Sequence, residues 1–342
     1  MDRRKIMSLG RSSLVISLPK HWIKLTELER GDFVTLNIQK DNSLIVFPGV
    51  RKEREDREIT LNVDPSENKD LLTRKIIACY LNGYFGINLI STDIFTVAQQ
   101  KAVRNIVGML YMRILESDSR RIYARIFVDE SKAPIETAIR RMHVITSSMF
   151  QDALKSLLNQ DVELARVVHG LDDDVDNLNF FLLRLLRGAV LHPSLAIKLG
   201  LEPIDCLDYQ TLVHRIEYVA DHAVTIAKNV IMSSGRGLWL SQSVVESLMN
   251  FGNQAFDMYN EAIRAFFARD INASNEVIER LEEMEMLNQK LALSTISVTE
   301  ALTVCMLCII RDSIKRIAEC ATDVAEITID HSYTPKPPFS NP

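Results

Sequence analysis

Arg215-Ile-Glu-Tyr-Val-Ala-Asp221-His-Ala-Val-Thr-Ile-Ala227 decides the fold, because the chain repeats it as Ser313-Ile-Lys-Arg-Ile-Ala-Glu319-Cys-Ala-Thr-Asp-Val-Ala325. An earlier stretch is repeated as well, with Asp161 corresponding to Asp270. Acidic positions are preserved together with apolar ones. Two copies of one helical unit therefore make up the second half of the chain. Because the two offsets differ, we expect the connection before the last helix to be shorter in the second copy.

The helical pattern predicts three helices in each copy, separated by a break at Gly235-Arg-Gly237. The predicted helices span 134–159, 161–190 and 204–232, then 241–269, 271–293 and 295–329. One face of the second helix is a regular apolar stripe that should pack between antiparallel neighbours. The stripe consists of Leu171, Val175, Leu178, Leu182 and Leu185. Asp161 and Asp270 stand at predicted helix starts, where a carboxylate accepts hydrogen bonds from free backbone amides.

Charge is segregated along the 342 residues. The formal net charge is −5, yet the first 24 residues are basic. No apolar run approaches the roughly 20 residues that a membrane span needs, and the start of the chain lacks the apolar core of a signal peptide. We therefore expect a cytoplasmic protein without membrane insertion.

The five cysteines form no disulfide framework, and Cys305-Met-Leu-Cys308 is interpreted as part of a helix core rather than a zinc site.

The first 48 residues predict short strands around one small helix. Leu14, Ile16 and Leu18 alternate with polar positions, and a hairpin pairs residues 34–38 with 44–47 through Lys40-Asp41-Asn42. Pro19 suits the first turn of a helix over 20–25. So few residues with thin apolar stripes form a marginal core, and intertwined dimerisation would correct that shortage.

A charged linker over 49–57 leads to a predicted α/β connector domain over 58–130. Its expected order is βαβαβ, with the helices over one sheet. The expected elements are strands at 58–63, 86–90 and 121–128 and helices at 69–83 and 95–115. No glycine-rich turn follows the first strand, so no dinucleotide site is expected. We interpret this domain as a connector or an oligomerisation module.

The amino-terminal segment carries a family resemblance. The run Arg4-Lys-Ile-Met-Ser-Leu-Gly-Arg-Ser-Ser-Leu-Val-Ile-Ser-Leu-Pro-Lys-His-Trp22, followed by Leu25-Thr-Glu-Leu-Glu-Arg-Gly-Asp32 and a hairpin, resembles the AbrB-type (SpoVT-AbrB) DNA-binding domains. The resemblance implies a swapped-hairpin β-barrel built by two chains. It also implies contacts with double-stranded DNA, since Lys and Arg neutralise phosphates and Arg can reach guanine edges. The candidate DNA-binding residues are Arg3, Arg4, Lys5, Arg11, Ser12, Ser13, Lys20 and Lys24. The alternative is a solvated basic face.

The helical half resembles the PhoU family of phosphate-signalling regulators. The resemblance rests on Asp174-Val-Asp176-Asn-Leu in the middle helix and on Glu217-Tyr-Val-Ala-Asp221-His in the third. It implies PhoU-like repeats over 133–234 and 238–330, followed by a tail over 331–342. The second copy departs from the pattern, because Lys315 stands where the first acid is usual. An AbrB-like module ahead of PhoU repeats looks like the archaeal PhoU-type transcriptional regulators, which makes the chain multidomain and mainly α.

Acidic residues recur on single helix faces, where like charges repel. The resemblance to PhoU proteins implies a divalent metal or iron on these acidic motifs, and carboxylates suit such cations. The candidate metal ligands are Asp172, Asp176, Glu217, Asp221, Asp312, Glu319 and Asp323. The alternative is a solvated acidic face.

A di-iron enzyme would need Glu-x-x-His pairs, and no histidine has an acid three positions before it. No hydrolase or phosphate-binding motif is present either. The chain is not expected to be an enzyme.

These observations lead to one hypothesis with one alternative. The first is a homodimeric, DNA-binding transcriptional regulator of phosphate uptake whose helical bundle is a sensor or a partner-docking module. The second is an adaptor that docks on a phosphate transporter or a sensor kinase and uses the AbrB-like segment only to dimerise. The expected partners are double-stranded DNA, a second copy of the chain, and a phosphate transporter or other PhoU-like proteins.

Overall fold

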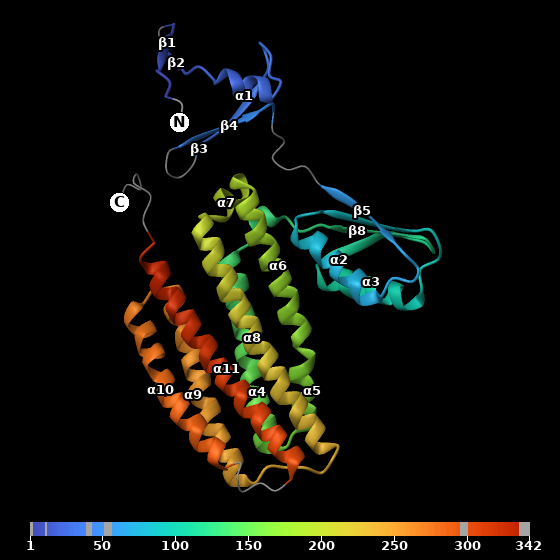
Figure 1. Ribbon diagram of the computed structural model, residues 1–342, viewed down its shortest axis with the longest axis vertical. Helices are drawn as coiled ribbons and strands as arrows, with labels where there is room; N and C mark the ends of the chain where they lie inside the picture. The colour runs from blue at the N-terminus through green and yellow to red at the C-terminus, as the bar shows by residue number, and fades with distance from the viewer. Residues whose placement is uncertain (1–2, 11, 39–42, 51–56, 295–299, 335–342) are drawn as a thin grey trace. The chain divides into compact units, whose positions relative to one another are not determined.

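The computed structural model describes residues 3–10, 12–38, 43–50, 57–294 and 300–334 (Figure 1). The chain divides into two compact units, one formed by Met1–Glu55 with Lys336–Pro342 and the other by Asp56–Pro335. In the described residues, no helix is long and apolar enough to cross a membrane.

The first unit contains two small antiparallel sheets and one short helix. In chain order they are β1 (Met7–Leu9), β2 (Ser13–Val15), α1 (Lys20–Leu25), β3 (Val34–Ile38) and β4 (Leu44–Pro48). β1 pairs with β2 and β3 with β4, with Leu36 opposite Val46. The predicted helix and hairpin are confirmed, whereas the predicted turn at residues 40–42 lies outside the described residues.

No described side chain of this unit is buried. Apolar residues of its strands and loops are largely exposed, including Leu14 at 73% and Phe33 at 74%. The single chain shows two separate hairpins and no closed barrel within these described residues. The predicted barrel would require strands from a second chain, and it stays a prediction.

The second unit begins with an α/β segment. Its elements are β5 (Glu58–Val63), α2 (Lys69–Leu81), β6 (Gly86–Ser91), α3 (Val97–Met109), β7 (Met112–Ser117) and β8 (Arg121–Ile126). The sheet order is β5-β6-β8-β7, with β5 parallel to β6 and β8 antiparallel to both of its neighbours. Alternation along β8 buries Ile122, Ala124 and Ile126 in the core shared with α2 and α3.

The prediction of one helix over 95–115 is wrong. α3 ends at Met109, Tyr111 adopts a left-handed φ of 53°, and β7 follows from Met112. The order is therefore βαβαββ rather than βαβαβ. Pairing of β7 with β8 satisfies the backbone groups of this stretch, and that pairing overrides the local preference for helix.

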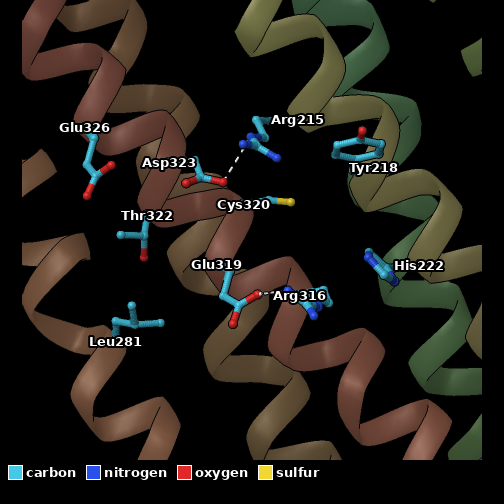
Figure 2. A pocket seen from close by; sticks show the side chains of 10 residues that line it. All are labelled: Arg215, Tyr218, His222, Leu281, Arg316, Glu319, Cys320, Thr322, Asp323 and Glu326. Atoms are coloured by element: carbon cyan, nitrogen blue, oxygen red, sulfur yellow. Dashed lines mark hydrogen bonds and ion pairs between the residues drawn. The ribbon is translucent and has the colours of Figure 1, made fainter.

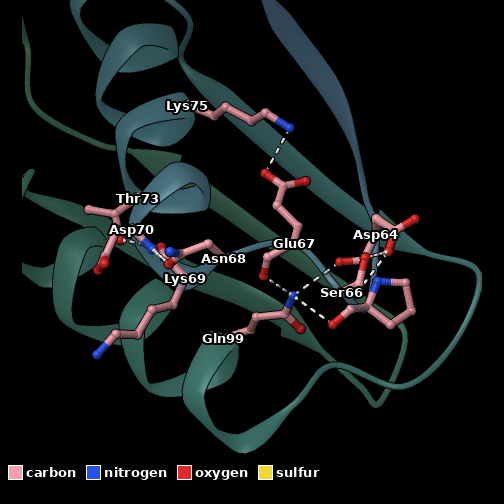
Figure 3. A network of polar contacts seen from close by, with 10 residues as sticks. Asp64, Ser66, Glu67, Asn68, Lys69, Asp70, Thr73, Lys75 and Gln99 are labelled. Carbon is pink, nitrogen blue, oxygen red and sulfur yellow. Dashed lines mark hydrogen bonds and ion pairs between the residues drawn. The ribbon is translucent and has the colours of Figure 1, made fainter.

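A buried glutamine joins the starts of α2 and α3 (Figure 3). The side chain of Gln99 donates to the backbone oxygens of Asp64, Pro65 and Glu67. Its Oε1 accepts from the amide of Thr96, completing a capping box at the start of α3. The loop after β5 is therefore held by a side chain that lies more than 30 residues away in the sequence.

The helical part follows a short 3₁₀ turn, η1 (Glu130–Lys132). Its helices are α4 (Ile135–Asn159), α5 (Val162–Gly170), α6 (Asp172–Leu191), α7 (Pro193–Leu199), α8 (Pro203–Ser234), α9 (Gln242–Ala268), α10 (Ile271–Ser294) and α11 (Ala301–Ser332). The predicted helix over 161–190 is two helices, because the chain breaks at Leu171 between Gly170 and three acids of a new first turn. α7 fills the longer connection of the first copy, and residues 295–299 of the last predicted helix lie outside the described residues.

The two copies share one apolar core. Val175, Leu178, Leu182 and Leu185 of the predicted stripe are buried in it, together with residues of all the long helices. Asp161 Oδ1 accepts from the amide of Leu164 at 3.0 Å, and Asp270 Oδ1 accepts from two amides of α10. Both repeated aspartates are thus confirmed as helix caps.

Three of the cysteines are buried, but Cys305 is exposed and Cys308 is partly exposed. The prediction that Cys305 and Cys308 belong to a buried helix core is therefore wrong.

A buried ion pair joins the α/β segment to the bundle. Arg184 of α6 and Glu130 of η1 are each 1% exposed, and Arg184 Nε donates to Glu130 Oε1 at 2.6 Å. Arg184 Nη1 also donates to the backbone oxygens of Tyr80 and Tyr84, at the end of α2. Neighbouring Arg187 donates to Leu81 O and Asn82 Oδ1. Two arginines of α6 therefore satisfy carbonyls at the carboxyl end of α2, where positive charge is favourable.

Candidate functional site

Four carboxylates from α6 and α8 act on one another and form the first acidic cluster. Its members are Asp172, Asp176, Glu217 and Asp221. Burial, followed by repulsion from the other three, raises the pKa of Glu217 to about 7. Burial, with repulsion from Asp172 and Asp221, raises the pKa of Asp176 to about 6. Lys228 is a cation that opposes the rise in the pKa of Asp172 and Asp221. The two acidic pairs at four-residue spacing therefore act as one group of partly buried acids, with Lys228 as a nearby cation.

The second acidic cluster is defined as Asp312, Glu319 and Asp323, all on α11, and its charges are largely neutralised. Glu319 pairs with Lys315 at 3.3 Å and with Arg316 at 2.9 Å. Asp323 pairs at 3.0 Å with Arg215, which comes from α8 of the first copy. Asp312 is exposed and acts with Glu319 in favour of the protonated form of His222, although burial lowers the pKa of that histidine overall.

A cavity of about 630 Å³ opens beside the second acidic cluster, between α8, α10 and α11. Figure 2 shows Glu319 and Asp323 projecting from α11 beside the guanidinium groups of Arg316 and Arg215. Tyr218 and His222 line the α8 side. Because arginines face the acids across short distances, the cavity offers mixed charge rather than a uniformly acidic or basic lining.

The two clusters differ in their fit to a metal ion. Among the residues that the structure describes, no three carboxylate, imidazole or thiolate groups converge closely enough to hold an ion. The first acidic cluster nevertheless has the donor chemistry that hard cations prefer, and burial with mutual repulsion raises the pKa of Asp176 and Glu217. The second acidic cluster does not fit, because Lys315, Arg316 and Arg215 already supply the positive charge.

The predicted DNA-binding residues lie on the surface of the first unit. Arg3, Arg4 and Lys5 precede β1, Ser12 lies in the turn before β2, Ser13 begins β2, and Lys20 and Lys24 lie on α1. All seven are exposed, and Arg11 lies outside the described residues. Exposure leaves these side chains accessible to a ligand.

The cations that pair with the second acidic cluster were not predicted as its partners. Lys315 and Arg316 stand four and three positions before Glu319, which is the spacing of helix ion pairs, so this signal was available. Arg215 had no such signal, because its pairing with Asp323 depends on how α8 packs against α11.

Comparison with known proteins identifies the helical part. Residues 139–230 and 248–328 match the family model described as PhoU domain, and together they make up just over half of the chain. The match leaves the first 138 residues outside the family model.

One curated relative and two solved structures each match 57% of the chain. The phosphate-specific transport system accessory protein PhoU homolog of Clostridium acetobutylicum is 23% identical over 210 residues, covering 57% of this chain and 89% of that protein. The crystal structure of PhoU from Pseudomonas aeruginosa has a TM-score of 0.51 at 19% identity, covering 57% of this chain and 93% of that chain. The phosphate transport system regulatory protein PhoU from Streptococcus pneumoniae has a TM-score of 0.50 at 17% identity, covering 57% of this chain and 91% of that chain. At such identities the two structures establish a shared fold.

Proposed function

Because the chain belongs to the PhoU domain family, we propose that it is a DNA-binding transcriptional regulator of phosphate uptake that acts as a homodimer. It is a regulatory protein and not an enzyme, as its family membership indicates. The phosphate role is taken from the names of its relatives, which refer to phosphate transport.

The DNA-binding part of the proposal rests on the exposure of the side chains in the amino-terminal unit. Basic side chains are exposed on a unit whose described residues bury no side chain. A module without a core of its own gains one by pairing with a second copy, as in the AbrB-type domains that it resembles. Pairing doubles Arg3, Arg4, Lys5, Lys20 and Lys24, and such a set neutralises several phosphates.

The bundle would be the sensor. Asp172, Asp176, Glu217 and Asp221 would attract a divalent cation, whose positive charge would offset the repulsion among the four carboxylates. The first acidic cluster spans α6 and α8, so a change in its repulsion acts on the packing of those two helices. α6 is tied in turn to the α/β segment through Arg184.

The mechanism would be thermodynamic linkage. A cation or a partner protein that binds one helix arrangement more tightly shifts the population toward that arrangement. If the two arrangements differ in DNA affinity, DNA must change the affinity for the cation or partner by the same factor.

The test is genomic occupancy of the tagged protein at high and low phosphate, followed by titration of the purified protein against a recovered site at several salt concentrations. We expect discrete sites near phosphate-transport genes and an affinity that falls as salt rises. The triple variant Arg4→Ala, Lys20→Ala, Lys24→Ala should make the negative slope of log K against log salt shallower by up to about 5 in a dimer. Arg236→Ala is the matched control, because Arg236 is an exposed arginine of the bundle.

The rival function is that of an adaptor without DNA binding, favoured by the accessory role in the name of the Clostridium relative. It predicts no discrete genomic sites, recovery of the protein with a phosphate transporter or sensor kinase, and no effect of the triple variant on that recovery. Those three results together would refute the proposed regulator.

A further inference from the structure

A second cavity, of about 290 Å³, lies where the α/β segment meets the bundle. Tyr111 and Val128 of the α/β segment form one side, and Ala138 of α4 with Leu178 and Phe181 of α6 forms the other. The volume is near the lower end for small-molecule sites. Both sides belong to the same compact unit, and the Arg184–Glu130 ion pair joins the same two parts of the fold.

Tyr111 reaches the cavity from an unusual backbone conformation. Its φ is 53°, which is a rare value for a bulky residue. Its ring meets Phe181 edge to face, with centroids 5.7 Å apart, yet Tyr111 remains 41% exposed. Such strained residues gather at ligand-binding positions. Two aromatic rings at the wall favour a flat, apolar ligand.

One formal charge lines the cavity, and it is positive. Arg141 contributes it from α4, and no carboxylate is among the residues that line this space. Within the part of the chain that the structure describes, Arg141 forms no ion pair, whereas neighbouring Arg140 is paired with Glu136 at 2.7 Å. A guanidinium without a carboxylate partner, at the edge of an apolar space, is suited to an anionic head group.

We propose that this cavity binds a small aromatic carboxylate, with its ring packed against Tyr111 and Phe181 and its carboxylate on Arg141. Such a ligand contacts the α/β segment and the bundle at once, so it stabilises their junction and acts as an effector. The inference goes beyond the proposed function and does not depend on it, because the cavity contains no residue of the amino-terminal unit or of either acidic cluster.

The test is a ligand-observed NMR titration of the full chain with sodium phenylacetate as the probe. We expect saturable binding with a Kd below about 1 mM. Phenylacetamide, which has the same shape without the charge, should bind at least about tenfold more weakly, because charge-assisted hydrogen bonds are the stronger ones. Absence of saturation with phenylacetate, or equal affinity for the amide, would overturn the proposal.

Two variants locate the binding. Arg141→Gln should weaken phenylacetate binding about tenfold, and Arg140→Gln, one position away on the same helix, should leave it nearly unchanged. Ala138→Phe should abolish binding by filling the cavity, with circular dichroism used to check that the chain still folds. If phenylacetate bound Arg141→Gln and the wild type equally well, the assigned site would be wrong.

Discussion

Replacing Arg184 by methionine should be among the most destabilising single changes in the second unit. Arg184 and Glu130 are each 1% exposed, so the substitution leaves the Glu130 carboxylate buried without its counter-ion. It also removes the donor to the Tyr80 and Tyr84 carbonyls and the guanidinium stacked at 4.9 Å from the Phe85 ring centroid. Removing one partner of a buried pair costs about 3–5 kcal/mol.

Urea unfolding followed by far-ultraviolet circular dichroism measures this loss. With an m-value of about 3 kcal/mol/M, the midpoint should fall by about 1–1.7 M. Arg187→Met is the control, since Arg187 makes comparable contacts with Leu81 and Asn82 but is exposed, and it should cost about 1 kcal/mol or less.

A double variant, Arg184→Met with Glu130→Met, removes both charges and should be more stable than the sum of the single effects implies. The explanation by an uncompensated buried charge would be refuted if Arg184→Met were no worse than the Arg187 control. Strict additivity in the double variant would refute it as well.

Further expectations concern local features of the bundle and the α/β segment. The folded-state pKa of Glu217, about 7, lies above its ordinary value, so the folded state takes up the proton first and the free energy of unfolding should rise as pH falls from about 8 toward 5. Glu217→Gln should stabilise by about 1 kcal/mol near pH 8, with solvent screening allowed for, and should flatten that rise in thermal unfolding; an unchanged slope would contradict the assignment. At Gly252, a Cβ atom would lie 2.6 Å from Leu154 Cδ2, so Gly252→Ala should lower stability by about 1–3 kcal/mol. Gly108→Ala, in open space on a helix, should raise stability by about 0.5–1 kcal/mol, and equal effects of the two glycine changes on the unfolding midpoint would contradict the packing argument. Asp161→Ala should cost about 1 kcal/mol by removing a helix cap, whereas Asp161→Asn should restore most of it in the same assay.

Local patterns explain which elements were predictable. The buried stripe of α6 and the caps at Asp161 and Asp270 depend on residues within a few positions of one another. The break at Leu171 was detectable too, since Gly170 precedes it and three acids open the next helix. That signal was outweighed by the continuous apolar stripe.

Other features had no local signal. Met112–Ser117 resembles a helix continuation, and it forms a strand only because β8 offers a partner for its backbone groups. Likewise, nothing near Arg184 indicates a buried cation, because its partner Glu130 and the two carbonyls come from distant positions.

The sequence alone determined the repeated helical unit, its apolar faces, its caps and the acidic character of its helices, since each depends on spacing along one element. Only the tertiary structure decided the pKa values and the ion-pair partners of those acids. The packing of α6 against α8 partly buries Glu217 near three other carboxylates and raises its pKa, while the packing of α8 against α11 pairs Arg215 with Asp323. Burial and long-range charge depend on which helices become neighbours, and a one-dimensional pattern does not contain that information.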